Sequence, residues 1–227
     1  DAYRIQSNDA VKLCYAGEVV KSKSFKILRS RTTIQVGAEI FGDSSMDAEL
    51  ESIKLMLKSL EISGIKDITL GIGHAGFTAS VLNQFQQLGQ EKLTLIEKAL
   101  SKKSISDLEN LVPNEHKHKA SILTLCELYG DLDIISKAKE EFAYLDSSNE
   151  SLSHLETIVN QLKEMGIQDI HIDLGEVQGF KYHNGIVFSA YSDKAGYVLS
   201  KGGRYDGLRK ASNEDRPAVG FDLDLVA

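Results

Sequence analysis

Two segments near the start of the chain have the apolar, β-branched character of strands. Residues 11–20 predict a strand that enters a turn, and residues 32–41 alternate between polar and apolar positions as a strand does. Segment 21–31 between them holds five basic residues and no acidic one. We therefore expect an antiparallel pair of strands joined by a long basic hairpin loop.

The next segment, 46–63, has helical spacing. Ser44 or Ser45 is placed to cap it, and acidic residues occupy its first turn. Gly64 is the expected C-terminal stop, and a strand is predicted over 67–72. The apolar stripe of this helix consists of Leu50, Ile53, Leu57 and Leu60.

A similar helix and strand recur later in the chain. A stripe from Leu155 to Met165 ends at Gly166, and a strand is predicted over 169–174. The strings Gly64-Ile-Lys-Asp-Ile68 and Gly166-Ile-Gln-Asp-Ile170 match, but two matches are too few for a solenoid. They indicate either two helix-to-strand units packed alike or a coincidence, because a tight helix-to-strand loop selects such residues.

Between these units, residues 77–150 have helical spacing throughout. An all-helical block inside an α+β framework predicts an inserted subdomain. We therefore expect residues 1–76 and 151–227 to form the α+β core and residues 77–150 a helical insertion. His116 and His118 lie in the block, and they are either residues of a solvated loop or, given further partners, metal ligands.

The last third returns to strand patterns. Strands are predicted over 185–191, 197–199 and 217–221, and Lys201-Gly-Gly-Arg-Tyr-Asp-Gly-Leu208 predicts a glycine-rich turn. Such glycines permit close approach of a ligand to the backbone, although many tight hairpins also use a Gly-Gly pair.

Composition excludes several classes of protein. The 227 residues include 26 Lys+Arg and 33 Asp+Glu, a net charge of -7, which argues against binding to nucleic acid or anionic membranes by bulk charge. No apolar run approaches the roughly 18 residues of a membrane span. Cys14 and Cys126 show neither metal nor disulfide spacing, so we expect a cytoplasmic protein. We also expect neither a metal nor a cofactor.

The C-terminal motifs together resemble those of a known family. Gly202-Gly-Arg-Tyr-Asp-Gly-Leu208, followed by Pro217-Ala-Val-Gly-Phe221, is similar to histidyl-tRNA synthetase, a class II synthetase. Tyr182-His-Asn-Gly-Ile-Val-Phe188 resembles its histidine-binding segment, and Leu13–Gly42 resembles its motif 2. The resemblance covers most of residues 11–224. It implies a class II aminoacyl-tRNA synthetase-like antiparallel sheet flanked by helices, with a helical insertion.

Departures from the synthetase pattern bear on activity. The synthetase places arginines that serve adenylation where this chain has Lys21, Gln178 and Ala227, and it has a glycine in place of Asp224. Adenylation needs cations on a phosphoryl group whose charge shifts, and the fork of arginine suits that task. Losing one such contact costs on the order of 100- to 1000-fold in rate. We therefore expect no working adenylation site.

A paralogous family resembles the chain more closely. In the ATP phosphoribosyltransferase regulatory subunits, motif 2 is similar to Leu13–Glu18 and Gln35–Glu39, and the histidine segment has a pair like Tyr182-His183. This resemblance implies a non-catalytic chain that activates a short-form catalytic phosphoribosyltransferase in a hetero-oligomer and takes part in feedback by histidine. It also implies self-association as a dimer. The alternatives are a divergent histidine-tRNA ligase and a synthetase-like partner of another protein.

The resemblance assigns a candidate pocket. Gln35 and Glu39 share one strand face, and spacing alone favours a solvated sheet face for them. They match the synthetase residues that hold the substrate's amino group, and this match favours a binding role. Tyr182 and His183 match the pair that closes the histidine pocket, although Tyr182 is as well explained by core packing.

Two further pairs complete the candidate residues. Arg29 and Arg31 match arginines of the synthetase hairpin, and they either bind an anion or belong to a solvated basic loop. For Arg204 and Tyr205 we expect a role in the turn in preference to ligand contact.

Overall fold

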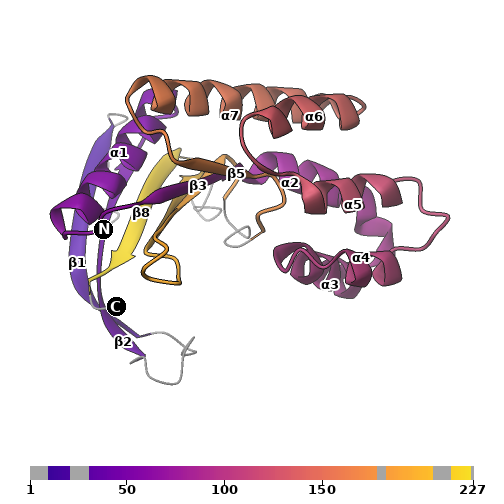
Figure 1. The fold of residues 1–227 in the computed structure, drawn as a ribbon, viewed down its shortest axis with the longest axis horizontal. Helices are drawn as coiled ribbons and strands as arrows, with labels where there is room; N and C mark the ends of the chain where they lie inside the picture. The colour runs from indigo at the N-terminus through magenta and orange to yellow at the C-terminus, as the bar shows by residue number, and fades with distance from the viewer. Residues whose placement is uncertain (1–9, 21–30, 178–182, 207–215, 226–227) are drawn as a thin grey trace. The chain divides into compact units, whose positions relative to one another are not determined.

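A computed structural model describes residues 10–20, 31–177, 183–206 and 216–225 of the chain (Figure 1). The chain forms two compact units, residues 1–70 with 188–227 and residues 71–187. Strands β3 (Thr69–His74) and β6 (Ile186–Tyr191) carry the chain across the two boundaries. The division expected from the sequence, with an insertion over 77–150, stays a prediction.

The first unit is built on antiparallel strands. Its order is β1 (Val11–Val20), β2 (Thr32–Phe41), β8 (Ala218–Asp224), β7 (Ser200–Tyr205) and β6. The pairings of β1 with β2, β2 with β8, and β7 with β8 are all antiparallel. The antiparallel pair expected at the start of the chain is therefore confirmed. The basic loop expected between its strands lies almost entirely outside the described residues.

Helix α1 (Met46–Ile62) packs on β2, β7 and β8 (Figure 1). Ser45 caps it as expected, because its Oγ accepts a hydrogen bond from the backbone N–H of Ala48 at 3.4 Å. The buried face differs from the expected stripe at one position: Met56 is fully buried, whereas Leu57 is half-buried. A helix lying across a twisted sheet buries the residues nearest the strands. Which residues these are depends on the angle between helix and strands, and a four-residue stripe does not specify that angle.

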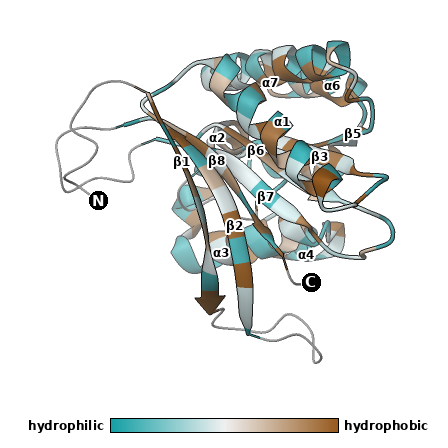
Figure 2. Cartoon of the chain, turned by 90° about the vertical axis from the view of Figure 1, so that its left-hand side faces the viewer, coloured by the Kyte–Doolittle hydropathy of each residue, from teal (hydrophilic) through white to brown (hydrophobic). Residues whose placement is uncertain are grey.

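The second unit is mostly helical. Its strand order is β3, β5 (Ile170–Asp173) and β4 (Tyr129–Gly130). The core includes Phe77 and Phe142, whose rings meet edge to face at 5.3 Å. Figure 2 shows hydrophobic and hydrophilic residues alternating round α7, as a half-buried helix requires. The helical elements are α2 (Ala75–Leu82), the 3-10 helix η1 (Asn83–Leu88), α3 (Gln90–Ser101), α4 (Ile105–Leu111), α5 (Lys119–Glu127), α6 (Asp133–Glu141) and α7 (Asp146–Glu164).

The two helix-to-strand units end their helices in the same way. Gly64 and Gly166 have φ angles of 83° and 91°. The backbone N–H of Ile65 bonds to Leu60 O at 3.1 Å, and that of Ile167 bonds to Leu162 O at 3.0 Å. Both helices therefore close with the same left-handed glycine cap.

The glycine-rich turn expected over 201–208 is wrong for residues 201–205, which belong to strand β7. The short strand expected over 197–199 is also wrong, because the strand begins at Ser200. Gly202 serves close packing, because a Cβ there would collide with the Phe188 ring and the Gly220 carbonyl. Gly207 and Leu208 lie outside the described residues.

Among the described residues, no helix is long and apolar enough to cross a membrane. Within those same residues, no group of three or more His, Cys, Asp or Glu side chains is arranged to hold a metal ion.

Candidate ligand-binding site

Strand β2 places Gln35 and Glu39 on one face of the first unit, and both are half-buried. The carboxamide of Gln35 and the carboxylate of Glu39 are each held by a tyrosine from another strand. Tyr15 on β1 donates its hydroxyl hydrogen bond to Gln35 Oε1 at 3.0 Å. Tyr205 on β7 donates to Glu39 Oε2 at 2.7 Å. The two side chains are therefore fixed rather than freely solvated.

Two glycines make room for this arrangement. A Cβ on Gly37 would collide with the Tyr15 ring and with the backbone carbonyl of Phe221. A Cβ on Gly220 would collide with the carboxylate of Glu39, which lies opposite it in the β2–β8 register. The absence of these side chains lets the tyrosine and the carboxylate lie against the sheet.

Burial raises the pKa of the Glu39 carboxyl above its ordinary value. The Tyr205 hydrogen bond opposes that effect, and the nearby charge of Asp222 adds to it. Desolvation is the largest cause, so the site lacks full compensation for a negative charge. A carboxylate in this condition gains more than a solvated one from an incoming ammonium group.

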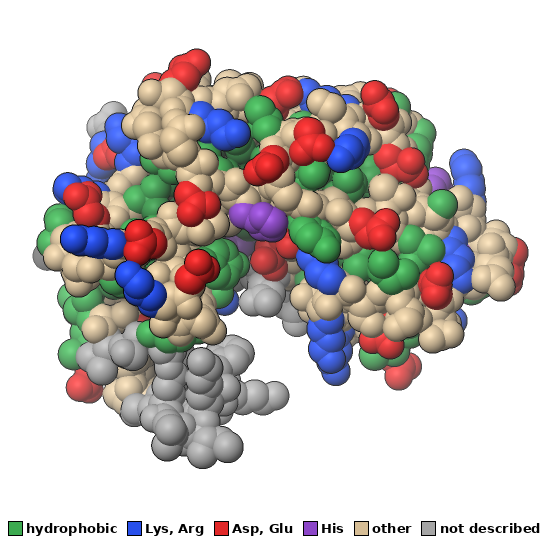
Figure 3. Space-filling model, viewed as in Figure 1, with side chains coloured by type: hydrophobic (Ala, Val, Ile, Leu, Met, Phe, Trp, Pro, Cys, Tyr) green, Lys and Arg blue, Asp and Glu red, His purple; other side chains and the backbone are tan. Residues whose placement is uncertain are grey.

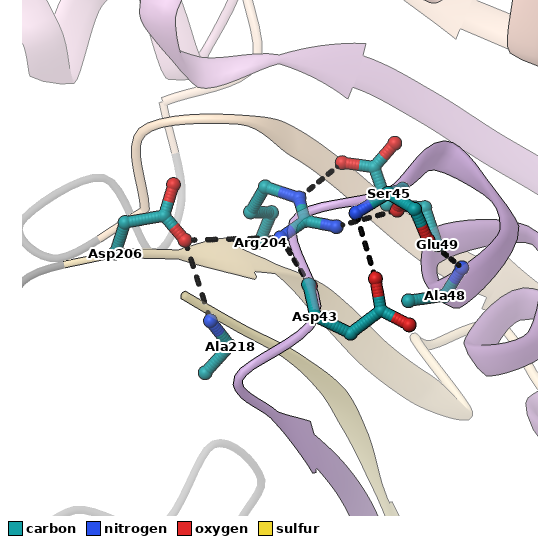
Figure 4. A network of polar contacts seen from close by, with 7 residues as sticks. All are labelled: Asp43, Ser45, Ala48, Glu49, Arg204, Asp206 and Ala218. Carbon is teal, nitrogen blue, oxygen red and sulfur yellow. Dashed lines mark hydrogen bonds and ion pairs between the residues drawn. The ribbon is translucent and has the colours of Figure 1, made fainter. Parts of the chain in front are cut away.

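On the other side of β7, Arg204 forms a buried network with the start of α1 (Figure 4). Its Nε donates to Glu49 Oε1, its Nη1 donates to Asp43 O at 3.1 Å, and its Nη2 donates to Ser45 O at 2.9 Å. Arg204 is 6% exposed and Glu49 is 1% exposed. Because consecutive strand residues point to opposite faces, β7 joins this network directly to the Tyr205–Glu39 contact.

Gln35, Glu39, Arg204 and Tyr205 were candidates from the sequence, but their connections were not predicted. Arg204 and Tyr205, expected in a turn, lie in a central strand instead. Their partners Tyr15 and Glu49 were not among the expected site residues. A signal existed for Glu49, since an acidic side chain on the buried face of a helix requires a cation close by.

The other candidates stay predictions. Tyr182 and Arg29 lie outside the described residues. His183 is described as half-buried and belongs to the second unit, whereas Glu39 belongs to the first. Arg31 is exposed immediately before β2.

A family model described as histidyl-tRNA synthetase matches residues 1–227. The chain belongs to the histidyl-tRNA synthetase family. Within that family, curated relatives carry the name ATP phosphoribosyltransferase regulatory subunit. The one from Burkholderia lata is 35% identical over 226 residues, which are 99% of this chain and 58% of that protein. The one from Cellvibrio japonicus is 32% identical over 232 residues, covering 100% of this chain and 58% of that protein. The chain thus spans a little over half the length of these relatives.

Solved structures share the fold of this histidyl-tRNA synthetase family member. An ATP phosphoribosyltransferase regulatory subunit/histidyl-tRNA synthetase from Bacillus halodurans matches with a TM-score of 0.79 at 23% identity, over 95% of this chain and 56% of that chain. The ATP phosphoribosyl transferase (HisG:HisZ) complex from Thermotoga maritima matches with a TM-score of 0.71 at 18% identity. The match covers 97% of this chain and 75% of that chain. These matches confirm the expected class II synthetase-like α+β fold.

Proposed function

We propose that the protein is a non-catalytic regulatory subunit of ATP phosphoribosyltransferase, which activates a short-form catalytic chain in the first step of histidine biosynthesis. The observation that carries this proposal is the 31–35% identity to proteins of that name across nearly the whole chain. The family resemblance alone does not separate a regulatory subunit from a synthetase, because the fold is common to both.

The residues at the adenylation positions support a regulatory role. The sequence has Lys21, Gln178 and Ala227 in place of the synthetase arginines, and Asp224 in place of a glycine. Asp224 lies opposite Gln35 in the β2–β8 register, so its carboxylate shares a sheet face with Gln35 and Glu39. A negative charge there opposes the binding of a triphosphate.

The Gln35–Glu39 site is proposed to bind the amino group of histidine. Glu39 offers a partly desolvated carboxylate, and Tyr205 fixes its position at 2.7 Å. Tyr182 and His183 are proposed to face the imidazole, and Arg29 and Arg31 to face an anion. Through this site the protein would contribute to feedback inhibition by histidine.

The remaining features follow from the same proposal. We propose that residues 77–150 form an insertion in the synthetase-like core, and that the protein forms a dimer within the hetero-oligomer. Cys14 and Cys126 are free thiols, which is consistent with a cytoplasmic location. Acidic and basic side chains are interspersed over the face shown in Figure 3, in keeping with a partner that is a protein and not a nucleic acid.

Reconstitution with a short-form catalytic chain tests the proposal. The full-length protein is mixed with that chain, and the mixture is followed by size-exclusion chromatography and by phosphoribosyltransferase activity. Co-elution with increased activity is expected. Separate elution with unchanged activity overturns the proposal. The alternative, a divergent histidine-tRNA ligase, predicts histidine-dependent pyrophosphate exchange, whereas co-purification of a different client would favour a partner of another protein.

A further inference from the structure

The second unit carries a groove unrelated to the Gln35–Glu39 site. Two adjoining hollows of about 500 and about 530 Å³ share Asn83, Gln84, Lys117 and His118 as lining residues. We call this feature the His118 groove. Volumes of this size are typical of sites that hold a small organic molecule. All of its lining residues lie within the described part of the helical unit.

One wall of the groove is an imidazole ring held rigidly in place. His116 stacks on the buried ring of Phe85, with centroids 4.7 Å apart and planes 13° apart. Its Nδ1 accepts from the backbone N–H of His118 at 3.2 Å, and its Nε2 pairs with the Gln87 amide at 2.7 Å. Because both ring nitrogens are occupied, His116 offers a ligand a flat face rather than a hydrogen bond.

The neighbouring His118, in contrast, offers a ligand a hydrogen-bond acceptor. Its ring stacks on Tyr144 at 5.1 Å, and its Nδ1 pairs with the Tyr144 hydroxyl at 3.2 Å. That hydroxyl also donates to Ser121 Oγ at 3.1 Å, so it accepts from His118 Nδ1–H. The lone pair of a neutral ring therefore lies on Nε2, which has no partner among the described residues.

The neutral form of His118 is favoured. Burial lowers its pKa, and the charges of Lys117 and His116 act in the same direction. The groove thus holds a fixed acceptor that can receive a hydrogen bond from a hydroxyl group.

The remaining lining residues differ in chemistry. Asn83 and Gln84 supply side-chain amides, and Lys117 supplies an exposed cation. Two carboxylates also line the groove, Asp146 at the start of α7 and the exposed Glu115. An isolated phosphate would pair with Lys117 but would be repelled by a carboxylate. A simple amine would be repelled by Lys117. A ligand with a flat base, a sugar and a phosphate has a partner for each group. Bases stack on histidine faces and bond to amides, sugar hydroxyls bond to carboxylates, and phosphates pair with lysine.

We propose that the His118 groove binds a free mononucleotide, with the base against His116 and the amides of Asn83 and Gln84, the sugar at His118 and Asp146, and the phosphate at Lys117. This site is separate from the proposed histidine pocket and does not depend on it. It gives the helical unit a ligand of its own.

Calorimetric titration of the full-length protein with adenosine monophosphate tests this site. Adenosine and ribose 5-phosphate are titrated alongside, each lacking one part of the ligand. We expect both to bind at least about tenfold more weakly than the nucleotide. Lys117→Ala should lower the affinity for adenosine monophosphate about tenfold or more and leave that for adenosine unchanged. Lys92→Ala, an exposed lysine of α3, is the matched control and should change neither affinity.

Three results would overturn the proposal. One is the absence of heat from adenosine monophosphate at millimolar concentration. Another is an affinity that Lys117→Ala leaves unchanged, which would place the nucleotide elsewhere. The third comes from a short single-stranded oligoadenylate: tighter, Lys117-dependent binding of the oligomer would make the groove an RNA contact. Glu39→Gln separates the two sites, because it should leave the nucleotide affinity unchanged while weakening any binding of histidine.

Discussion

Glu39 combines two properties that oppose each other. Its carboxylate is held in place by the Tyr205 hydroxyl in the proposed ligand site, and burial disfavours its charge. Between the ordinary pKa of 4.5 and the raised pKa, the folded protein binds more protons than the unfolded chain. The contribution of this group to stability therefore falls as pH rises through that window. At neutral pH the ionised carboxylate destabilises the fold that it serves.

Glu39→Gln should therefore raise the free energy of unfolding at neutral pH. The amide keeps an oxygen that accepts from Tyr205, and it carries no charge. The same change should weaken histidine binding about 10- to 100-fold, because a charge-assisted contact is worth roughly 1.5–3 kcal/mol. Thermal unfolding and calorimetry measure the two effects. Glu61→Gln, an exposed change on α1, is the control. A variant that is less stable and binds histidine normally would contradict this account.

Whereas the charge of Glu39 destabilises the fold, the charge of Arg204 stabilises it. Removing one partner of a buried ion pair typically costs about 3–5 kcal/mol, because the other charge is left buried. Arg204→Met should lose stability of that order in urea unfolding. Lys12→Met breaks the exposed pair with Glu51, whose atoms lie 2.6 Å apart, and should cost less than about 1 kcal/mol. Equal losses in the two variants would show that Arg204 does not hold α1 to β7.

At the scale of elements, the two glycine caps show how much a local signal conveys. Gly64 and Gly166 were predicted as helix stops, and both adopt positive φ angles with the same hydrogen-bond pattern. The signal succeeds because the reason is local: a residue with a Cβ is strained in that conformation whatever surrounds it.

Gly166→Ala should therefore destabilise the protein by about 1 kcal/mol, through backbone strain alone, since nothing lies within 4 Å of an added Cβ. Gly17→Ala in β1 has equal space without a positive φ and should be neutral or slightly stabilising. Chemical denaturation of the two variants compares them directly. A loss at Gly17 as large as that at Gly166 would assign the effect to something other than the cap.

Strand β7 shows where local signals fail. Its Gly-Gly pair suggested a turn, but Gly202 is required by a residue elsewhere in the sequence, Phe188, whose ring packs against it. Likewise, the spacing of Gln35 and Glu39 put them on one face, while their tyrosine partners depend on strand order. The position of candidate residues was predictable from the chain, and their hydrogen-bond partners required the register of β1, β2, β7 and β8.

For the whole molecule, the family resemblance predicted the fold that periodicity left open. The hydrophobic pattern indicated α+β with a helical block, but it did not give the strand order, because non-local pairing leaves little trace in a single sequence. The motifs from Gly202 to Phe221, through their likeness to a class II synthetase, supplied the antiparallel sheet flanked by helices, while the strand order came from the structure. Even so, the resemblance did not reveal the His118 groove, whose parts come from three separate segments.

The full-length protein should form no histidyl-adenylate. With three arginine positions changed and Asp224 added, several orders of magnitude in rate should be lost. Pyrophosphate exchange with histidine and ATP measures this, with an authentic histidyl-tRNA synthetase as the positive control. Robust exchange would instead establish a ligase.

The close approach of Gly220 to Glu39 bears on how inherited variation in this chain should be interpreted. Gly220→Ala adds a single methyl group to a buried strand and would be scored as conservative in most substitution schemes. Yet that methyl group needs the space that the Glu39 carboxylate occupies. Under the proposed function, a strain carrying it would retain every proposed pocket residue and still lose the response to the ligand of Glu39. A survey of natural alleles restricted to the pocket side chains would overlook it.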